Sequence, residues 1–335
     1  MLYVKKLTKK INTVIFYILT MSFLYSLSEY KDLVRKRICK ICRSVPGEIG
    51  VAALHIEKNQ IIEFNGKKFF PMASTYKIPI AIYCLSLIDS NKLKLDQLIK
   101  FTHYDLRRFT FITDKEIKKK KELFSLRDLI SRMLENSDNA ASDKVLSVIG
   151  GPQAVTDWLH KQGFKNINID RSTLNMCADF SGVSNFGGEA NFSVRLYNKR
   201  LYSVPKKKKI IALKKFYDDK RDTVTPCEIV TILGLMFQKK LISNKSTKFL
   251  LERMSNCTWA SHRFLKFLPK NTKIWQKTGS LEGLISDIGI LELPKNKGHM
   301  VIAIFSNGSN FNVYKRELAM AHITKELYNY FLQSS

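Results

Sequence analysis

The stretch PMASTYKIPIAIYCLSL, residues 71–87, decides how the rest of the chain is interpreted. From residue 78 to residue 87 it is almost wholly apolar, which predicts a buried helix rather than a surface helix. Ser74 and Lys77 are three residues apart, so both side chains should lie on one face of the first turn of that helix. A lysine ammonium at a helix start opposes the helix dipole. Either the Lys77 side chain extends to solvent, or it lies beside Ser74 and accepts its hydroxyl proton.

Both ends of the chain predict strands of one sheet. The segments IGVAALHIE (49–57) and QIIEFNGKKFF (60–70) have the composition of a β-hairpin. Three further strands are expected near the other end, in TKIWQKTG (272–279), LISDIGILEL (284–293) and HMVIAIFS (299–306). A helix over about 313–333 should close the chain.

The sequence between these ends has helical periodicity. Apolar residues recur at spacings of three and four in LRDLISRMLENSDNAASDKVLSVIG (126–150), PQAVTDWLHKQG (152–163) and TPCEIVTILGLMFQKKLIS (225–243). We therefore predict an α+β fold: an antiparallel sheet built from both chain ends and flanked by helices, with an all-helical subdomain inserted between the ends. The expected division assigns 29–88 and 269–335 to the sheet subdomain and 89–268 to the helical subdomain.

One segment of the helical subdomain, 175–221, differs from its surroundings. It is first polar and punctuated by glycine, and then rich in lysine. We expect it to form a basic loop insertion. A loop of this length in a compact domain is usually functional or disordered.

The chain is strongly basic, with 56 Lys and Arg against 29 Asp and Glu and a formal net charge of +27. Such a charge suits nucleic acid, anionic envelope polymers or lipid headgroups. The lysine runs at 118–121 and 206–209 carry no interleaved aromatic residues and accompany no nucleic-acid motif, which favours solvated loops. We predict no nucleic-acid partner and leave association with an anionic envelope or membrane surface open. We expect a monomer.

The N-terminus indicates export. MLYVKKLTKK (1–10) is basic, and the next 17 residues, 11–27, are apolar and uncharged. Small residues at Ser26 and Ser28 then stand at the spacing of a signal-peptidase site. We predict that 1–28 is a signal peptide and that the mature protein is periplasmic. The alternative is an uncleaved membrane anchor facing the periplasm.

The cysteines and histidines predict no metal site and no cofactor. The six histidines show no metal-ligand spacing, and Cys39 and Cys42 form a CxxC pair with no second pair to complete a site. In an exported chain these two thiols are incidental or form a disulfide bond.

Two further motifs accompany Ser74-x-x-Lys77. Ser137-Asp138-Asn139 lies between two helical stretches, and Lys277-Thr278-Gly279 ends a predicted strand. Taken singly, the first fits a helix N-cap and the second a strand-end turn. In this order the three motifs are the set found in class A β-lactamases and penicillin-binding proteins. The chain resembles class A serine β-lactamases from about residue 45 to residue 332, and SDNAASDKVLSVIGGPQAVTDWLHKQG (137–163) and KTGS (277–280) both look like segments of that family.

The resemblance implies a two-part fold with the site in the seam, and it implies roles for four catalytic residues. Ser74 would be the nucleophile, activated by Lys77. Ser137 would relay a proton to the leaving lactam nitrogen, and Lys277 would hold that relay and attract the substrate carboxylate. The backbone N–H groups of Ser74 and Ser280 would form the oxyanion hole.

The resemblance also implies a substrate-binding set. Asn139 would bind the side-chain amide of the substrate, Thr278 and Ser280 its carboxylate, and Phe109 would wall the cleft. The complete set is Asn139, Thr278, Gly279, Ser280, Phe109 and Asn175.

The chain departs from the family where the acyl-enzyme is hydrolysed. The family places a glutamate four residues before an asparagine, in a Glu-x-x-Leu-Asn pattern. Here the matching text is IDRSTLNM (169–176), and Arg171 stands four residues before Asn175. Asp222 matches the aspartate that pairs with an arginine at the start of this loop, here Arg171, so 175–221 would be an insertion in that loop. Asp143 stands where the family usually has a supporting asparagine.

A further departure concerns the substrate carboxylate. SLEGLISDIGIL (280–291) contains no arginine, although many members of the family have one there. The acylation residues are nevertheless intact.

Three functions remain open from the sequence. The first is a serine β-lactamase, acting slowly or with an acid from the insertion, in which Glu189 is the only glutamate. The second is a DD-peptidase or transpeptidase acting on peptidoglycan, which needs no hydrolytic glutamate. The third is a non-catalytic envelope-binding homologue, which the intact acylation residues disfavour. We favour β-lactam hydrolysis because the resemblance covers nearly the whole mature chain.

Overall fold

The computed structural model describes residues 29–257, 259, 263–308 and 312–333. The predicted signal peptide or anchor, 1–28, lies outside these residues. Among the residues that are described, no helix has both the length and the apolar character needed to cross a bilayer.

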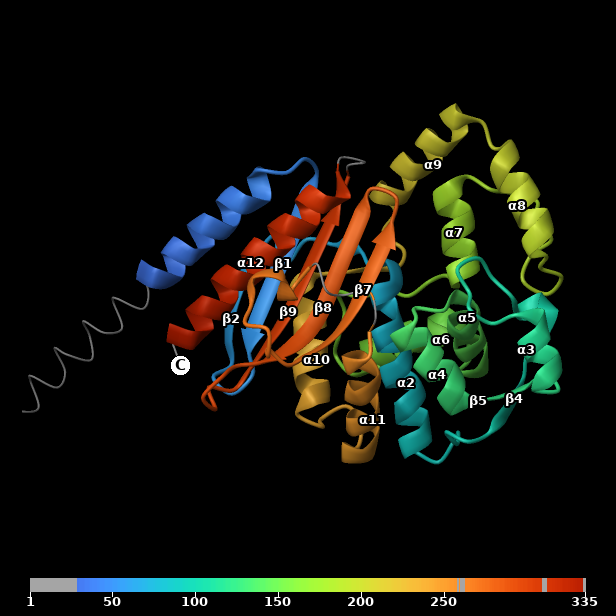
Figure 1. Cartoon of the computed structure of the whole chain (residues 1–335), viewed down its shortest axis with the longest axis horizontal. Helices are drawn as coiled ribbons and strands as arrows, with labels where there is room; N and C mark the ends of the chain where they lie inside the picture. The colour runs from blue at the N-terminus through green and yellow to red at the C-terminus, as the bar shows by residue number, and fades with distance from the viewer. Residues whose placement is uncertain (1–28, 258, 260–262, 309–311, 334–335) are drawn as a thin grey trace, which may run out of the picture.

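A five-stranded antiparallel sheet forms one half of the molecule (Figure 1). Its strand order is β2-β1-β9-β8-β7. The strands are β1 (Glu48–His55), β2 (Gln60–Phe64), β7 (Ile274–Leu281), β8 (Leu284–Glu292) and β9 (His299–Asn307). The prediction of a sheet assembled from both chain ends is confirmed, because the N-terminal β1 pairs along its length with the C-terminal β9.

Helices cover both faces of this sheet. A helix over 29–43 and α12 (Val313–Gln333) lie side by side on one face, as Figure 1 shows, and α10 (Pro226–Phe237) packs on the other. The alternation of β-strand side chains explains this arrangement. Val51 and Ala53 enter the core beneath 29–43 and α12, whereas Ala52 enters the core shared with α10.

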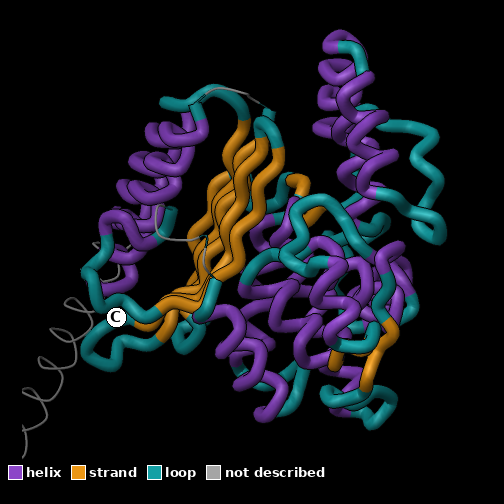
Figure 2. Tube along the Cα trace, turned by 45° about the vertical axis from the view of Figure 1, so that its right-hand side comes forward, coloured by secondary structure: helices purple, strands orange, loops and turns teal. Residues whose placement is uncertain are grey.

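The second half of the molecule is helical (Figure 2). Its helices are α3 (Asp114–Lys119), α4 (Leu126–Glu135), α5 (Asn139–Val148), α6 (Gly151–Lys161), α7 (Thr173–Ser181), α8 (Val194–Ser203), α9 (Lys206–Asp218) and α11 (Asn244–Ser255). Short pairs of strands join parts of it: β3 (Phe70–Pro71) with β6 (Thr223–Val224), and β4 (Leu98–Lys100) with β5 (Leu123–Ser125). Single turns of 3-10 helix lie at His103–Asp105 and Leu265–Phe267. The division of the chain at residues 88 and 269 stays a prediction.

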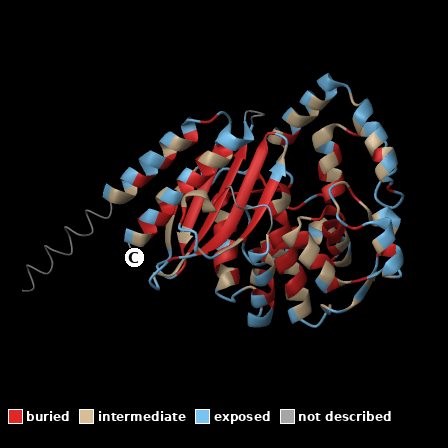
Figure 3. Ribbon diagram, viewed as in Figure 1, coloured by how far each residue is buried: buried red, intermediate tan, exposed pale blue. Residues whose placement is uncertain are grey.

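The helix predicted from residues 78–87 is the central one. Helix α2 (Lys77–Asp89) contacts α4, α5, α6 and α11, and most of its side chains are buried (Figure 3). It begins at Lys77, after a turn of 3-10 helix over Ala73–Tyr76. Ser74 therefore lies in the turn that precedes α2 rather than in the first turn of the helix itself.

The expectation of a loop over 175–221 is wrong. Most of α7 and the whole of α8 and α9 lie in this segment. The lysines, the leucine and the alanine of α9 are good helix formers, and the high charge of the segment hid this helical preference. Gly182 ends α7 in the left-handed conformation, with φ of 67°, which is the ordinary role of glycine after a helix.

Candidate active site

The turn that carries Ser74 is pressed against strand β7. The Ser286 hydroxyl donates a hydrogen bond of 2.8 Å to the carbonyl oxygen of Met72. A Cβ atom at Gly279 would lie 2.9 Å from that carbonyl oxygen and 3.0 Å from the backbone nitrogen of Ser74. Only glycine lets the strand approach the turn this closely. Ala73 has a φ of 48°, so the backbone just before Ser74 lies in a region that non-glycine residues seldom occupy.

Lys77 extends from the first turn of α2 into the interior. Its ammonium donates hydrogen bonds to the carbonyl oxygen of Ser137 at 2.7 Å, to Ser137 Oγ at 3.3 Å and to Asn139 Oδ1 at 2.8 Å. The side chain is fully buried, so it does not extend to solvent. Burial, with a smaller contribution from the charge of Lys277, lowers the pKa of Lys77 to about 7. A substantial neutral fraction, able to accept a proton, therefore exists near neutral pH.

Ser137 lies between two lysines. The Lys277 ammonium donates to Ser137 Oγ at 2.9 Å and to the carbonyl oxygen of Thr278 at 2.9 Å. Burial lowers the pKa of Lys277 to about 8. Ser137 has a φ of 59°, in the left-handed region that non-glycine residues seldom occupy. The Ser137 hydroxyl thus connects Lys77, which is 60 residues before it, to Lys277, which is 140 residues after it.

Asp138 confirms the ordinary interpretation of its motif. It is the N-cap of α5, where its carboxylate accepts a hydrogen bond from the backbone N–H of Ala141 at 2.9 Å. The same carboxylate accepts from the Thr110 hydroxyl at 2.8 Å and from the backbone N–H of Phe111 at 2.7 Å. Asp138 therefore has two structural roles: it caps α5, and it holds the 109–111 segment beside Ser137.

A cleft of about 770 Å³ opens in front of Ser74 and Ser137. Of the ten predicted site residues, six line it: Ser74, Phe109, Ser137, Asn139, Thr278 and Ser280. The two lysines lie behind Ser137, and Gly279 abuts the Ser74 turn. Phe109 is 69% exposed at the rim, where it can contact a ligand, and it makes little contribution to the core.

Arg263 also belongs to the site and was not predicted from the sequence. This buried guanidinium donates to Ser280 Oγ at 2.7 Å and to the carbonyl oxygens of Gly279 at 3.1 Å and Ser286 at 2.7 Å. It also lines the cleft, so a cation does lie next to Ser280 even though 280–291 contains no arginine. Arg263 stands in a short segment between α11 and β7, where no motif marks it.

Asp287 is buried close to two of the site cations, Arg263 and Lys277. Its carboxyl group is fully buried opposite Thr278, and among the described residues neither oxygen has a hydrogen-bond partner. Burial raises the pKa of Asp287 well above its usual value, against the opposing effect of the charges of Arg263 and Lys277. A protonated Asp287 does not neutralise Lys277, whereas Arg263 is paired with Glu317 at 3.2 Å, a residue that also lines the cleft.

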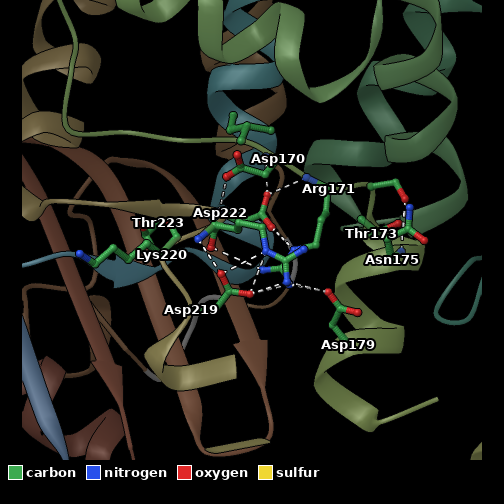
Figure 4. Close-up of polar contacts among 12 residues, drawn as sticks. Asp170, Arg171, Thr173, Asn175, Asp179, Asp219, Lys220, Asp222 and Thr223 are labelled. Atoms are coloured by element: carbon green, nitrogen blue, oxygen red, sulfur yellow. Dashed lines mark hydrogen bonds and ion pairs between the residues drawn. The ribbon is translucent and has the colours of Figure 1, made fainter. Parts of the chain in front are cut away.

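The segment 170–175, which enters helix α7 at Thr173 and is called the 170–175 turn below, is held by an ion-pair network (Figure 4). The Arg171 guanidinium bonds Asp222 at 2.5 Å, Asp179 at 2.8 Å and Asp219 at 3.2 Å. The predicted pairing of Arg171 with Asp222 is confirmed. Because Asp179 lies on α7 and Asp219 just after α9, the same guanidinium also joins the insertion to this turn.

Asp143 supports the turn from the other side. Its carboxylate accepts hydrogen bonds from the backbone N–H groups of Thr173 at 2.7 Å and Leu174 at 3.2 Å, and it pairs with Arg107 at 2.9 Å. The Thr173 hydroxyl lies 2.5 Å from the same carboxylate, and Thr173 lines the cleft. The shortened turn therefore presents a threonine to the cleft and no carboxylate of its own.

Glu189 of the insertion folds back onto this turn. Its carboxylate accepts a hydrogen bond from the Asn175 amide at 2.8 Å and another from the Ser172 hydroxyl. Asn175, which was predicted to bind substrate, does not itself line the cleft. The two residues that contact Glu189 flank Thr173, so this carboxylate lies on the turn that lacks the family glutamate.

The site was also examined for side chains that could bind a metal ion. Across the described residues, no group of three or more His, Cys, Asp or Glu side chains is placed to hold an ion. All six cysteines are free thiols, including Cys39 and Cys42.

Comparison with known proteins agrees with this geometry. The sequence model of the beta-lactamase enzyme family matches residues 33–331. Beta-lactamase VEB-1 of Pseudomonas aeruginosa is 25% identical over 319 residues, which are 93% of this chain and 94% of that protein.

Solved structures show the same fold. A β-lactamase from Chitinophaga pinensis has a TM-score of 0.70 and 25% identity, over 88% of this chain and 98% of the other. An ancestral class A β-lactamase has a TM-score of 0.72 and 22% identity, over 88% and 99% of the two chains. The predicted fold class is confirmed. The chain belongs to the beta-lactamase enzyme family, in its class A serine branch.

Proposed function

We propose that this protein hydrolyses β-lactams through an acyl-enzyme on Ser74. One observation carries the proposal: Ser137 Oγ is hydrogen-bonded by two buried lysine ammonium groups, and all of them lie beside the turn that holds Ser74. A purely structural site has no reason to bury two cations against one hydroxyl, because burial of each charge is costly. Acyl transfer uses such an arrangement to move a proton from nucleophile to leaving group.

Acylation then uses groups that are already in place. Ser74 Oγ attacks the lactam carbonyl carbon and its proton passes to neutral Lys77. The carbon–nitrogen bond breaks, and Ser137 passes a proton from Lys77 to the lactam nitrogen. The backbone N–H groups of Ser74 and Ser280 stabilise the oxyanion. Lys277, with Arg263 behind Ser280, provides the positive charge that attracts the substrate carboxylate.

Deacylation needs a base that the turn itself lacks. We assign this role to Glu189, which does not itself line the cleft but is bonded to Asn175 and Ser172 on either side of Thr173, a residue that does. In this step the carboxylate takes a proton from water as the water oxygen attacks the acyl carbonyl. The bond from the acyl carbon to Ser74 Oγ then breaks, and the proton is returned to Ser74 Oγ, which regenerates the serine hydroxyl and the carboxylate. The insertion would thereby replace the missing glutamate from another part of the chain.

The family match and the named relatives do not favour the two alternatives from the sequence, a peptidoglycan acyltransferase and a non-catalytic homologue. Labelling with a fluorescent penicillin separates all three functions when it is combined with hydrolysis of a chromogenic cephalosporin. Ser74→Ala should abolish both signals, whereas Ser90→Ala, at the far end of α2, should preserve them. Labelling that survives Ser74→Ala would refute the nucleophile, and stable labelling without hydrolysis would favour the acyltransferase.

We also propose that the chain is exported to the periplasm and acts there as a monomer. The basic and apolar N-terminal residues support export. N-terminal sequencing of periplasmic protein should begin near Glu29, and sedimentation should give the mass of one chain. Full-length protein found only in the cytosol would contradict this proposal.

A further inference from the structure

Helices α8 and α9 form a hairpin that projects from the helical half of the molecule. Figure 1 shows them in yellow at the edge farthest from the N-terminal helix, with α9 beside α7. Only Val204 and Pro205 separate α8 from α9. Half of the residues of α8 and most of those of α9 are exposed (Figure 3).

The base of this hairpin is fixed to the protein. Phe216 is buried and meets the Phe180 ring edge-on, with ring centroids 5.6 Å apart. The Tyr217 hydroxyl donates a hydrogen bond of 2.8 Å to the carbonyl oxygen of Glu282, between β7 and β8. A Cβ atom at Gly182 would lie 3.1 Å from the Ala212 methyl group, so α9 packs closely on the end of α7. These contacts fix the position of the hairpin, so its exposed side chains form a defined surface.

That surface is densely basic. Residues 193–217 contain no acidic side chain. In the described part of the chain none of their basic residues forms an ion pair: Arg195, Lys199, Arg200, Lys206, Lys207, Lys208, Lys209, Lys214 and Lys215. Four of these lysines occupy the first turn of α9, where positive charge opposes the helix dipole and lowers helix stability. An anionic surface would remove this penalty.

The other four-lysine run shows the usual arrangement. Lys118 and Lys119 occupy the last turn of α3, where the dipole favours cations, and Lys120 pairs with Asp128 at 2.8 Å. The 118–121 run needs no partner to account for it. It is a natural control for the 206–209 run.

Exposed apolar side chains lie among the hairpin cations. Tyr202 is 76% exposed, Ile210 is 59% exposed and Ile211 is 48% exposed. Tyr202 lies on α8, and the two isoleucines lie on α9 directly after the lysine run. Exposed apolar groups beside cations suit the interface of a membrane, where the apolar groups enter the acyl boundary and the cations meet the headgroups. A nucleic acid offers phosphates for the lysines but no apolar layer for the two isoleucines.

We propose that the α8–α9 hairpin docks on a phospholipid bilayer that contains anionic headgroups. The lysines of α9 supply the electrostatic attraction, and Tyr202, Ile210 and Ile211 enter the interface. This surface is separate from the catalytic cleft, so the proposal does not depend on the proposed hydrolysis. Each basic residue held against an anionic leaflet contributes about five-fold to partitioning, which corresponds to ~1 kcal/mol.

Amine footprinting of the full chain tests the proposal within one molecule. Lysine acetylation is measured by peptide mass spectrometry, with and without vesicles of phosphatidylglycerol and phosphatidylcholine. We expect the vesicles to protect Lys206, Lys207 and Lys208 while Lys118 and Lys119 react as before. Because each run is compared with the other, membrane attachment through residues 1–28 cannot produce the difference. Neutral phosphatidylcholine vesicles, or high salt, should remove the protection.

Matched triple variants provide the second test, by vesicle sedimentation. Replacing Lys206, Lys207 and Lys208 by Gln should weaken partitioning by about 100-fold, the product of three five-fold losses. The same replacement of Lys118, Lys119 and Lys121 should change it by less than three-fold, and both variants should keep the wild-type rate of β-lactam hydrolysis. Equal protection of both runs, or equal loss in both variants, would overturn the proposal. Binding of the hairpin to duplex DNA but not to vesicles would overturn it in favour of a nucleic acid.

Discussion

Replacing Glu189 by glutamine tests how the acyl-enzyme is hydrolysed. Glu189 is exposed, and the hydrogen bonds recorded for it go to Asn175 and Ser172. Glutamine keeps the size of the side chain and an oxygen that can accept both bonds, so the turn should keep its structure. The substitution removes the ability to take a proton from water. Any large effect is therefore chemical rather than structural.

The expected magnitude follows from the step that is affected. Loss of a general base slows water attack about 10²–10⁴-fold, or roughly 3–5 kcal/mol in activation free energy. Acylation depends on Ser74, Lys77 and Ser137, none of which contacts Glu189. The rate of acylation should change little, so kcat should fall and the acyl-enzyme should accumulate.

The assay separates the two steps. Stopped-flow mixing with a chromogenic cephalosporin should give a burst close to one equivalent of enzyme, followed by a slow phase. Intact-mass spectra after mixing with a penicillin should show a persistent adduct one drug mass heavier. Asp218→Asn is the matched control, because it removes one exposed carboxylate from the same insertion and should behave as wild type.

Two results would refute this reasoning. If wild type and Glu189→Gln both turn over rapidly with no detectable adduct, another group activates the water. The second result is a wild-type enzyme that already accumulates the same long-lived adduct, with no change in Glu189→Gln. In that case the insertion supplies no base, and the enzyme is slow because it lacks one.

Three further predictions concern the lysines and the strand beside Ser74. Acylation should have a bell-shaped pH profile, rising through about 7 as Lys77 loses its proton and falling above about 8 as Lys277 loses its own. Lys277→Arg should remove the falling limb, because arginine stays charged. Gly279→Ala should lower the acylation rate at least tenfold, because its Cβ would lie 2.9 Å from the carbonyl oxygen of Met72 and 3.0 Å from the nitrogen of Ser74. Lys77→Met should be more stable than wild type, and this difference in the free energy of unfolding should shrink as pH rises. Urea titrations between pH 7.5 and 9.5 should show a decrease of about 1.4 kcal/mol per pH unit.

Each of these has a contrary outcome. A flat pH profile for single-turnover acylation would show that neither lysine changes charge in this range. Wild-type acylation by Gly279→Ala would show that the strand can move away from the turn at little cost. A constant stability difference between Lys77→Met and wild type would mean that Lys77 keeps its proton in the folded chain throughout the range measured.

Local patterns in the sequence predicted the frame of this fold well. The C-terminal helix was expected over about 313–333, and α12 spans Val313–Gln333. Its residues repeat with helical period, and the strands before it alternate or are wholly apolar, so each element is determined by its own residues. The insertion was mistaken for a loop because its helices bury few side chains. Without a buried stripe, a charged helix has the same periodicity as a solvated coil.

The site was predictable where its residues form motifs and not where they act across the fold. Ser74, Ser137 and Lys277 stand in short signatures. The structure brings Ser74 and Ser137 to one cleft and places the Lys277 ammonium on the Ser137 hydroxyl. Arg263 has no such signature, because its position depends on a segment between α11 and β7 that happens to pass beneath Ser280. Glu189 was identifiable only as the one glutamate of the insertion, and its contact with Asn175 depends on the path of the segment between α7 and α8.

The burial of Lys77 and Lys277 lowers the stability of the fold, and a catalytic role explains why both are present. At pH 7 both lysines are protonated in the unfolded chain, where their pKa is the usual 10.5. In the folded chain their pKa values are lower, about 7 for Lys77 and about 8 for Lys277. Below a pH of about 7 the full penalty of both shifts applies, and it is relieved as pH rises toward 10.5, because only the unfolded chain then still holds the protons. At pH 7 the two shifts together cost several kcal/mol, a large part of the ~5–15 kcal/mol by which domains are stable. A fold that had lost its reaction would gain stability by replacing either lysine with an apolar residue. The retention of both, on one hydroxyl beside Ser74, is therefore the strongest physical argument that the acylation step still operates.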